Sequence, residues 1–218
     1  MIVVSLQYQK NDIMDAIKMI QERRSVNFFD PTKKLDEETL KNIINLAVNA
    51  PSASNLQPWR IIAIRSDEAK ERFWNIAFKQ PKVKESSVNL LIVGNLNGWN
   101  KDNPVWEEML QSVGGKVEVV EASQKGAAAG NGSTEARRIA FAQANSGLLA
   151  MSIMYAASAY GVDSHPMNGF DYEAVHKEFG LADHEMPVMN ICLGYFDKSK
   201  TLRPRRPRRG FDEIVEML

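Results

Sequence analysis

One segment in the second half of the chain restricts the fold more than any other feature. The sequence of residues 134–160 predicts one long helix, which Gly161 ends. After Ser146 the apolar side chains of this helix occupy more than one face. A helix of that kind has to be covered on several sides, so we expect it at the centre of the molecule or at a subunit interface. Its most apolar stretch, residues 147–157, is only about half as long as a bilayer requires, so we expect no membrane span.

Shorter elements flank this helix. Asp36 is placed to cap a helix whose apolar residues at positions 40, 43, 44, 47 and 48 have helical spacing, and which ends before Pro51. Residues 68–78 and 172–179 predict two further helices, and the C-terminal tail is briefly helical at its end.

Strands are predicted from the apolar runs at residues 61–64, 90–93 and 188–193. Residues 114–133 contain most of the helix breakers, and we expect a flexible excursion there. The elements do not alternate regularly, as they would in a doubly wound sheet. The sequence therefore predicts an α+β fold, with residues 1–218 forming one domain.

Charge and cysteine content exclude several classes of protein. The chain has 27 Lys and Arg and 27 Asp and Glu, so no global field draws it to nucleic acid or to a membrane surface. The single cysteine, Cys192, rules out an intrachain disulfide or a cysteine-based zinc site, and it lies in an apolar run typical of a buried strand. The N-terminus does not resemble a signal peptide. These features predict a cytoplasmic location.

Familiar catalytic and metal motifs are missing from the sequence. His165, His176 and His184 have spacings that fit no compact metal motif, and there is no Gly-x-Ser-x-Gly elbow of a hydrolase. Residues 126–134 are rich in glycine, but they lack the lysine of a phosphate loop and do not follow a strand, so we expect a mobile loop. We therefore predict no metal site and no catalytic dyad.

The first candidate binding segment is Arg23-Arg24-Ser25. It lies at the end of an amphipathic helix whose isoleucines stand at positions 13, 17 and 20. Cations at a helix end can simply complement the helix dipole. Alternatively, the planar fork of arginine can grip a phosphate. This segment alone leaves both interpretations open.

The second candidate is the loop at residues 50–59. Its two prolines restrict the backbone, and its polar side chains are Ser52, Ser54, Asn55 and Gln57. Together they offer donors and acceptors from a rigid loop between a helix and a strand. A structural turn needs fewer polar groups than this. The loop suits the edge of a heteroaromatic ring and a polyol chain.

The third candidate is the basic tail at residues 203–209, Arg-Pro-Arg-Arg-Pro-Arg-Arg. It could be a solvated tail, or a weak patch for nucleic acid or lipid. One short basic stretch on a neutral protein argues against nucleic acid. A second phosphate grip that folds back onto the first uses the same residues.

In this order and at this spacing, the three segments resemble the nitroreductase family of flavoenzymes. The resemblance covers nearly the whole chain, and it includes residues 166–171, the strand at 187–194 and residues 213–215. Its most specific part is the loop that ends in Gln57-Pro58-Trp59. The resemblance implies a mixed, mainly antiparallel sheet surrounded by helices, in an intertwined homodimer with FMN in each of two interface pockets.

The resemblance also implies which residues bind FMN. Arg23 and Ser25, with Arg24 beside them, would contact the phosphate and the ring edge, and Arg206 and Arg208 would complete the phosphate site. The loop of the other subunit would line the flavin, and the backbone at residues 168–169 would approach the flavin N5. The expected FMN-binding residues are Arg23, Arg24, Ser25, Asn27, Pro51, Ser52, Ala53, Ser54, Asn55, Gln57, Lys82, Pro166, Met167, Asn168, Gly169, Arg206 and Arg208.

Two positions depart from the usual pattern of the family. Relatives often have lysine where this chain has Asn27, which removes one cation near the N1–C2=O edge of the flavin, and Lys82 is the candidate to replace it. Many relatives have glutamate where this chain has Asn168. Because the backbone makes the contact with N5, we expect the chemistry to be retained. Both changes bear on the redox potential and not on the identity of the cofactor.

The activity implied by the resemblance is that of an NAD(P)H-dependent oxidoreductase. Hydride would pass through FMN N5 to small electron-poor acceptors such as nitroaromatics or quinones, in a ping-pong cycle without an obligatory side-chain acid or base. The alternatives are dehalogenase-like or flavin-fragmenting chemistry in the same fold, and a non-catalytic module that binds flavin or nucleic acid. Trp99, Trp106 and Met109 either face the substrate or pack across the dimer.

Overall fold

An antiparallel sheet forms the centre of the fold. The computed structural model describes residues 16–218. Within them, the sheet has four strands in the order β1-β2-β4-β3, and each neighbouring pair is antiparallel. The strands are β1 (Trp59–Ile64), β2 (Val88–Asn95), β3 (Asp163–Met167) and β4 (Glu185–Gly194). An isolated parallel bridge joins Ser25 to Ser164, which agrees with the predicted mixed, mainly antiparallel sheet.

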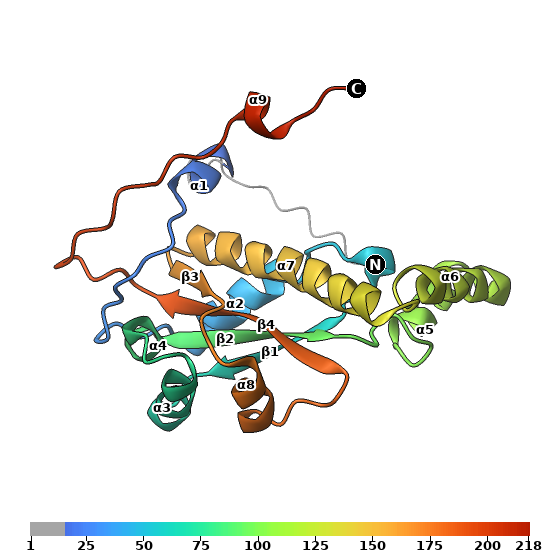
Figure 1. The fold of residues 1–218 in the computed structure, drawn as a ribbon, viewed down its shortest axis with the longest axis horizontal. Helices are drawn as coiled ribbons and strands as arrows, with labels where there is room; N and C mark the ends of the chain where they lie inside the picture. The colour runs from blue at the N-terminus through green and yellow to red at the C-terminus, as the bar shows by residue number, and fades with distance from the viewer. Residues whose placement is uncertain (1–15) are drawn as a thin grey trace.

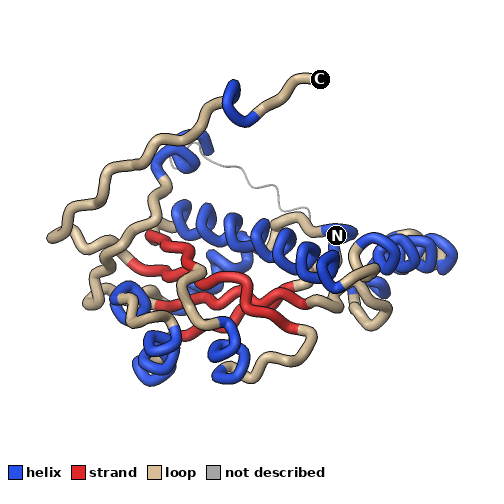
Figure 2. The backbone as a smooth tube through the Cα atoms, viewed as in Figure 1, coloured by secondary structure: helices blue, strands red, loops and turns tan. Residues whose placement is uncertain are grey.

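Helices cover both faces of this sheet. In chain order, the helices of the described residues are α1 (Ala16–Glu22), α2 (Glu37–Ala47), the 3₁₀ turn η1 (Ala53–Asn55), α3 (Asp67–Ile76), α4 (Pro81–Glu85), α5 (Val105–Ser112), α6 (Val117–Gly130), α7 (Glu135–Ala159), α8 (Tyr172–Glu178) and α9 (Phe211–Ile214). Helices α2 and α7 lie on one face, and α3, α4 and α8 lie on the other (Figures 1 and 2). Helices α5 and α6 extend beyond one end of the sheet (Figure 1). The α+β architecture is therefore confirmed.

The long helix predicted at residues 134–160 is confirmed as α7, which crosses the sheet (Figure 1). The side chain of Thr134 accepts a hydrogen bond from the Arg137 N–H at its start, and Gly161, at a φ of 68°, follows its end. Length and mean hydropathy alone would let α7 cross a bilayer, but half of its apolar window is buried inside the fold. It is the core helix that its apolar faces predicted.

Strand β2 shows why its apolar run is continuous. Leu90 and Ile92 belong to the core under α2 and α7, whereas Leu91 and Val93 belong to the core under α3 and α8. Successive side chains of a strand point to opposite faces, so a strand covered on both faces needs apolar residues throughout. Cys192 is likewise fully buried, as predicted, and burial raises the pKa of its thiol to about 12.

The predicted flexible excursion at residues 114–133 is wrong, because most of it is helix α6. Gly126 and Gly130 suggested a break, but both lie in open space, and the helix tolerates them. Val120 and Ala127 bury one side of α6 in a third cluster of apolar residues. The mobile loop predicted at residues 126–134 is wrong for the same reason, since its first residues complete α6.

Two other helix predictions need correction. Of the isoleucines that marked the first helix, Ile13 lies outside the described residues, and Ile17 and Ile20 are largely exposed on α1. Asp36 caps α2 as predicted, with its Oδ1 2.7 Å from the Thr39 N–H. Val48 was expected in the core, yet it is exposed because the helix has already ended there.

Candidate functional site

Residues from both ends of the described chain line one cavity beside β3. Arg23, Arg24 and Ser25 follow α1, whereas Arg206 and Arg208 belong to the C-terminal tail, which runs back past α1 (Figure 1). The cavity has a volume of about 270 Å³, and we call it the arginine cavity. Its lining residues are Arg23, Arg24, Ser25, Asn27, His165, Leu202, Arg203, Pro204, Arg205, Arg206 and Arg208. The structure thus brings together the two predicted phosphate grips.

Two arginines fasten the tail to the start of the cavity. Arg24 Nη2 donates to the Arg203 carbonyl at 2.5 Å. Arg205 Nη2 donates to the Gln21 carbonyl at 2.5 Å and to the Arg23 carbonyl at 3.0 Å. Arg205 was not predicted, because the alternation of Arg and Pro in the tail does not show which arginine turns back to the chain. Arg24 and Arg205 therefore hold the cavity in shape.

The remaining arginines concentrate positive charge. Within residues 16–218, no carboxylate forms an ion pair with Arg23, Arg206 or Arg208. Burial lowers the pKa of Arg23, and the nearby charges of Arg205, Arg208 and Arg24 lower it further, although Tyr155 opposes them. Like charges gathered without counter-charges are the expected form of a site for an anion.

Strand β3 lies along the predicted segment at residues 23–27. The Val26 N–H donates to the Ser164 carbonyl at 3.1 Å, and His165 Nδ1 donates to the Val26 carbonyl at 2.7 Å. Burial and the charge of Lys82 lower the pKa of His165 to about 4, so its ring is neutral at physiological pH. From the sequence, His165 was considered only as a possible metal ligand, and its neighbours Ser164 and Pro166 gave no signal that it lines this cavity.

A chain of two hydrogen bonds connects Lys82 to the backbone just after β3. Lys82 Nζ donates to Gln80 Oε1 at 2.8 Å, and Gln80 Nε2 donates to the Gly169 carbonyl at 2.7 Å. A Cβ at Gly169 would lie 2.8 Å from Gln80 Nε2, so a larger residue there would displace the end of the Gln80 side chain. Lys82 itself does not line the arginine cavity. Gln80 is a further residue that the sequence did not single out.

The segment at residues 166–169 presents mainly its backbone. The Met167 side chain is buried in the core under α3 and α8, so it cannot reach the cavity. Asn168 is exposed, and among the described residues the Gly169 N–H has no hydrogen-bond acceptor. A free backbone N–H at this position agrees with the predicted backbone contact to a ligand.

The loop at residues 51–57, which we call the Pro-Ser loop, has a strained backbone. Ser54, Asn55 and Gln57 have φ angles of 50°, 56° and 46°. Non-glycine residues rarely adopt this left-handed region, and they persist in it only where their surroundings hold them. The side chains of Ser54 and Asn55, like those of Pro51 and Ala53, are exposed. The loop is therefore shaped by forces other than its own burial.

Side-chain hydrogen bonds supply those forces. Ser52 Oγ accepts from the Gln57 N–H at 3.0 Å, and the buried Asn145 of α7 accepts from the Ala53 N–H at 2.8 Å. Asn103 Nδ2 donates to the carbonyl of the buried Leu56 at 2.8 Å. The loop is thus held by three residues, which we call its clamps: Ser52 within the loop, Asn145 on α7 and Asn103 before α5.

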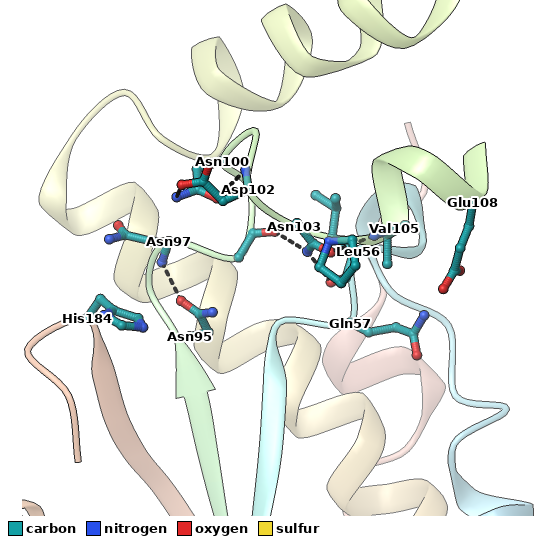
Figure 3. Close-up of a pocket in the computed structure, with 12 residues that line it drawn as sticks. Leu56, Gln57, Asn95, Asn97, Asn100, Asp102, Asn103, Val105, Glu108 and His184 are labelled. Atoms are coloured by element: carbon teal, nitrogen blue, oxygen red, sulfur yellow. Dashed lines mark hydrogen bonds between the residues drawn. The ribbon is translucent and has the colours of Figure 1, made fainter. Parts of the chain in front are cut away.

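A polar cavity of about 640 Å³ lies beside the Pro-Ser loop (Figure 3). Gln57 and Glu108 stand on one side of it, and Asn95 and His184 on the other (Figure 3). The side chains of Asn95 and Asn103 form hydrogen bonds with backbone groups of the segment that lines this cavity. Asn95 Oδ1 accepts from the Asn97 N–H, and Asn103 also donates to the Gly98 carbonyl. These hydrogen bonds stabilise the backbone beside the Pro-Ser loop, and the residues that line this cavity include no Lys or Arg.

Within one chain, the Pro-Ser loop and the arginine cavity are apart. The loop is tied to Asn145 of α7, whereas Arg23 interacts with Tyr155 of the same helix. Ten residues of an α-helix span about 15 Å. Within one chain, the predicted residues Arg23, Arg206 and Arg208 therefore line a common cavity, whereas the predicted residues of the Pro-Ser loop lie outside it.

The aromatic residues before and within α5 have structural contacts. Trp106 is only 3% exposed and lies in the third cluster of apolar residues. Its side chain therefore packs inside its own subunit and does not face a substrate or a partner subunit. Its Nε1 donates to the Asn100 carbonyl at 2.6 Å. Trp99 Nε1 donates to the Leu96 carbonyl, and a Cβ at Gly132 would lie 2.6 Å from the Trp99 ring. Met109 packs against the same cluster.

Comparisons with known proteins assign the chain to a family. Residues 20–195 match a family model described as the nitroreductase family. The chain is 34% identical to a NADH dehydrogenase of Thermus thermophilus over 190 residues, which are 84% of this chain and 87% of that protein. It is 33% identical over 182 residues to YodC of Bacillus subtilis, provisionally named an NAD(P)H nitroreductase, covering 83% of this chain and 89% of that protein.

A solved structure from Exiguobacterium sibiricum, in complex with FMN, has the same fold. The TM-score is 0.78 at 26% identity, and the match covers 94% of this chain and 98% of that chain. The family match includes Arg23, the Pro-Ser loop and β3, but it ends before Arg206 and Arg208. The place of the tail in the site therefore comes from the structure.

Proposed function

Because the chain belongs to the nitroreductase family of oxidoreductases, we propose that it binds FMN and oxidises NAD(P)H as a homodimer in the cytoplasm. The observation that carries this proposal is the arginine cavity. Its arginines come from both ends of the chain and have no carboxylate partners among the described residues. A dianionic phosphate supplies the counter-charge that such a cavity lacks. The residues present therefore fit the phosphate of FMN.

The residues that line the arginine cavity and those beside it have different tasks in this proposal. Arg23, Arg206 and Arg208 would hold the phosphate, and Ser25 and Asn27 would contact the chain beside it. The free Gly169 N–H and the Gln80–Lys82 pair would face the ring. When bound, FMN would supply the redox chemistry, with hydride passing from NAD(P)H through N5 to small electron-poor acceptors such as nitroaromatics or quinones. The chain needs no acid or base for this step.

The Pro-Ser loop would serve the FMN of the partner subunit. Its exposed side chains and its distance from the arginine cavity along α7 support this assignment. The exposed Ile17 and Ile20 of α1 and Leu148 of α7 are apolar surface that a partner subunit would cover. We propose one domain over residues 1–218, because α7 packs against the whole sheet. The tail arginines are used within the cavity, so nucleic acid is not a proposed partner.

An absorbance spectrum of the purified protein, before and after anaerobic addition of NADPH and then NADH, tests the proposal. We expect a yellow protein whose flavin band bleaches, and the nucleotide that bleaches it faster is the preferred donor. The doubly substituted Arg23→Ala/Arg208→Ala protein should be purified with little flavin. Arg209→Ala is the matched control, since Arg209 belongs to the same tail but does not line the cavity. A wild-type protein that neither takes up FMN nor oxidises NAD(P)H overturns the proposal.

Steady-state kinetics test the acceptor and the cycle. With a nitrofuran or a naphthoquinone as acceptor, double-reciprocal plots at several NAD(P)H concentrations should be parallel, because one site serves both partners in turn. Intersecting lines would mean that both partners bind together. Release of halide from a haloaromatic substrate would instead support the dehalogenase-like alternative.

A further inference from the structure

His165 is a neutral ring within the arginine cavity, and its tautomer is fixed by its neighbour. Its Nδ1 lies 2.7 Å from the Val26 carbonyl oxygen. A carbonyl can only accept a hydrogen bond, so Nδ1 must carry the hydrogen. The other ring nitrogen, Nε2, then has a lone pair and no hydrogen. Val26 is itself bonded to Ser164 of β3, so the ring is held between two adjacent segments.

Burial, and after it the charge of Lys82, keep Nε2 unprotonated, because both make a second proton on the imidazole unfavourable. Arg23, Arg24, Arg206 and Arg208 line the same cavity. Nε2 is therefore a hydrogen-bond acceptor in a cavity whose arginines can only donate.

The size of the cavity limits which part of a ligand His165 can meet. At about 270 Å³, the cavity lies below the range of roughly 300–1,000 Å³ that holds a whole small ligand. It can take a phosphate and the chain next to it, while a ring system would lie outside. A phosphate bound by arginines satisfies their donors but leaves the acceptor of His165 without a donor.

We propose that His165 Nε2 accepts a hydrogen bond from a hydroxyl of the ligand, on the polyol chain adjoining the phosphate. His165 thereby selects a phosphorylated polyol side chain over an alkyl phosphate. This inference rests on the proposed FMN site and adds a residue to it that determines specificity.

Binding measurements with two ligands and two variants test the proposal. The ligands are FMN and an analogue that keeps the phosphate but has an unhydroxylated five-carbon chain. In His165→Asn, the shorter amide can still donate to the Val26 carbonyl but does not reach the position of Nε2. A net hydrogen bond contributes about 0.5–1.5 kcal/mol. We therefore expect the Kd of FMN to rise about 2- to 12-fold, with the Kd of the analogue unchanged.

The second variant keeps the acceptor. In His165→Gln, an amide oxygen can occupy the position of Nε2, and we expect the ratio of the two Kd values to stay within about threefold of the wild-type ratio. If His165→Asn discriminates between FMN and the analogue as well as the wild type does, His165 does not contact the hydroxyl. If the wild type fails to bind FMN at all, the proposed function itself is wrong.

A spectroscopic measurement on the wild-type protein does not depend on the folding of any variant. The chain has only 3 histidines, so ¹⁵N spectra of the rings can be assigned. We expect the Nδ1–H tautomer for His165, and a shift of its Nε2 resonance when FMN binds but not when inorganic phosphate binds. An Nε2–H tautomer, or an Nε2 resonance that FMN leaves unchanged, would overturn the proposal.

Discussion

The arginine cavity gathers residues from both ends of the chain, whereas the Pro-Ser loop is one continuous segment at residues 51–57. The cavity holds like charges that no carboxylate neutralises within the described residues. The loop holds a strained backbone that Ser52, Asn103 and Asn145 clamp from three directions. Hydrogen bonds within the chain thus fix the shape of the loop, while the cavity, under the proposed function, is completed when an anion enters it. Changes to the cavity should alter ligand affinity, and changes to the clamps should alter stability.

The largest effect is expected from removing two arginines of the cavity. Hydrogen bonds to charged groups contribute about 1.5–3 kcal/mol each. The Arg23→Ala/Arg208→Ala protein should therefore bind FMN at least about 100-fold more weakly, as measured by quenching of flavin fluorescence. Its thermal unfolding without ligand should change little, because the substitutions also relieve repulsion among the arginines. Unchanged FMN affinity, or a loss of affinity equal to that of Arg209→Ala, would refute the phosphate grip.

A smaller effect, this time on stability, is expected from removing a clamp of the Pro-Ser loop. Asn145→Ala leaves the Ala53 N–H without its acceptor and removes the bond from Asn145 Nδ2 to the Phe141 carbonyl. Each of the two lost hydrogen bonds contributes about 0.5–1.5 kcal/mol, so together they contribute about 1–3 kcal/mol. We expect the free energy of unfolding, from urea titration, to fall by that amount.

Asn75→Ala is the matched control for this clamp. Asn75 makes the same bond to the carbonyl four residues earlier, with a distance of 3.0 Å, but it is exposed on α3 and holds no loop. Its loss should change stability by less than about 0.5 kcal/mol. Equal losses in the two variants would mean that the clamp adds nothing to the helix bond.

The difference between the two regions also explains what the sequence could predict. Local signals were sufficient for α7, which Thr134 and Gly161 delimit, and for the cap of α2 by Asp36. The Pro-Ser loop was recognised from its composition, but the clamp by Asn145 was not, because 92 residues separate it from Ala53. Hydrogen bonds between distant residues depend on the fold as a whole and leave no local pattern.

The same reasoning applies to the arginine cavity. Arg23 and Arg208 were predicted through a resemblance, and the structure brings them together. The structural tasks of Arg24 and Arg205 depend on which carbonyls the tail passes as it returns. His165 was missed because its importance comes from the neighbouring Val26 carbonyl and from Lys82. Helix α6 was missed because its glycines face open space, which the sequence does not reveal.

A third prediction uses an anion to distinguish the arginine cavity from the Pro-Ser loop. Inorganic phosphate should stabilise the FMN-free protein, because it supplies the counter-charge that the cavity lacks. At ten times its Kd, a ligand that binds only the folded state contributes about 1.4 kcal/mol. The rise in Tm should persist in Asn145→Ala and vanish in Arg23→Ala/Arg208→Ala. Chloride at the same ionic strength is the control, and an equal rise with chloride would indicate a general salt effect.

A fourth prediction is a dependence of stability on pH that originates in the cavity. The pKa of His165 is lowered to about 4 by burial and by Lys82, whereas an unfolded histidine has a pKa of about 6.5. Between these values the unfolded chain binds more protons than the folded chain. The FMN-free protein should therefore lose stability as the pH falls from about 6.5 to about 4, with no further loss from this group below that range.

Two comparisons assign that loss of stability to His165. In His165→Asn, the decrease in the free energy of unfolding between about pH 6.5 and pH 4 should be smaller, because no imidazole is left to protonate. The clamps of the Pro-Ser loop contain no titrating group, so Asn145→Ala should keep the wild-type dependence on pH at a lower overall stability. Equal dependence in His165→Asn and the wild type would place the titrating group outside the arginine cavity.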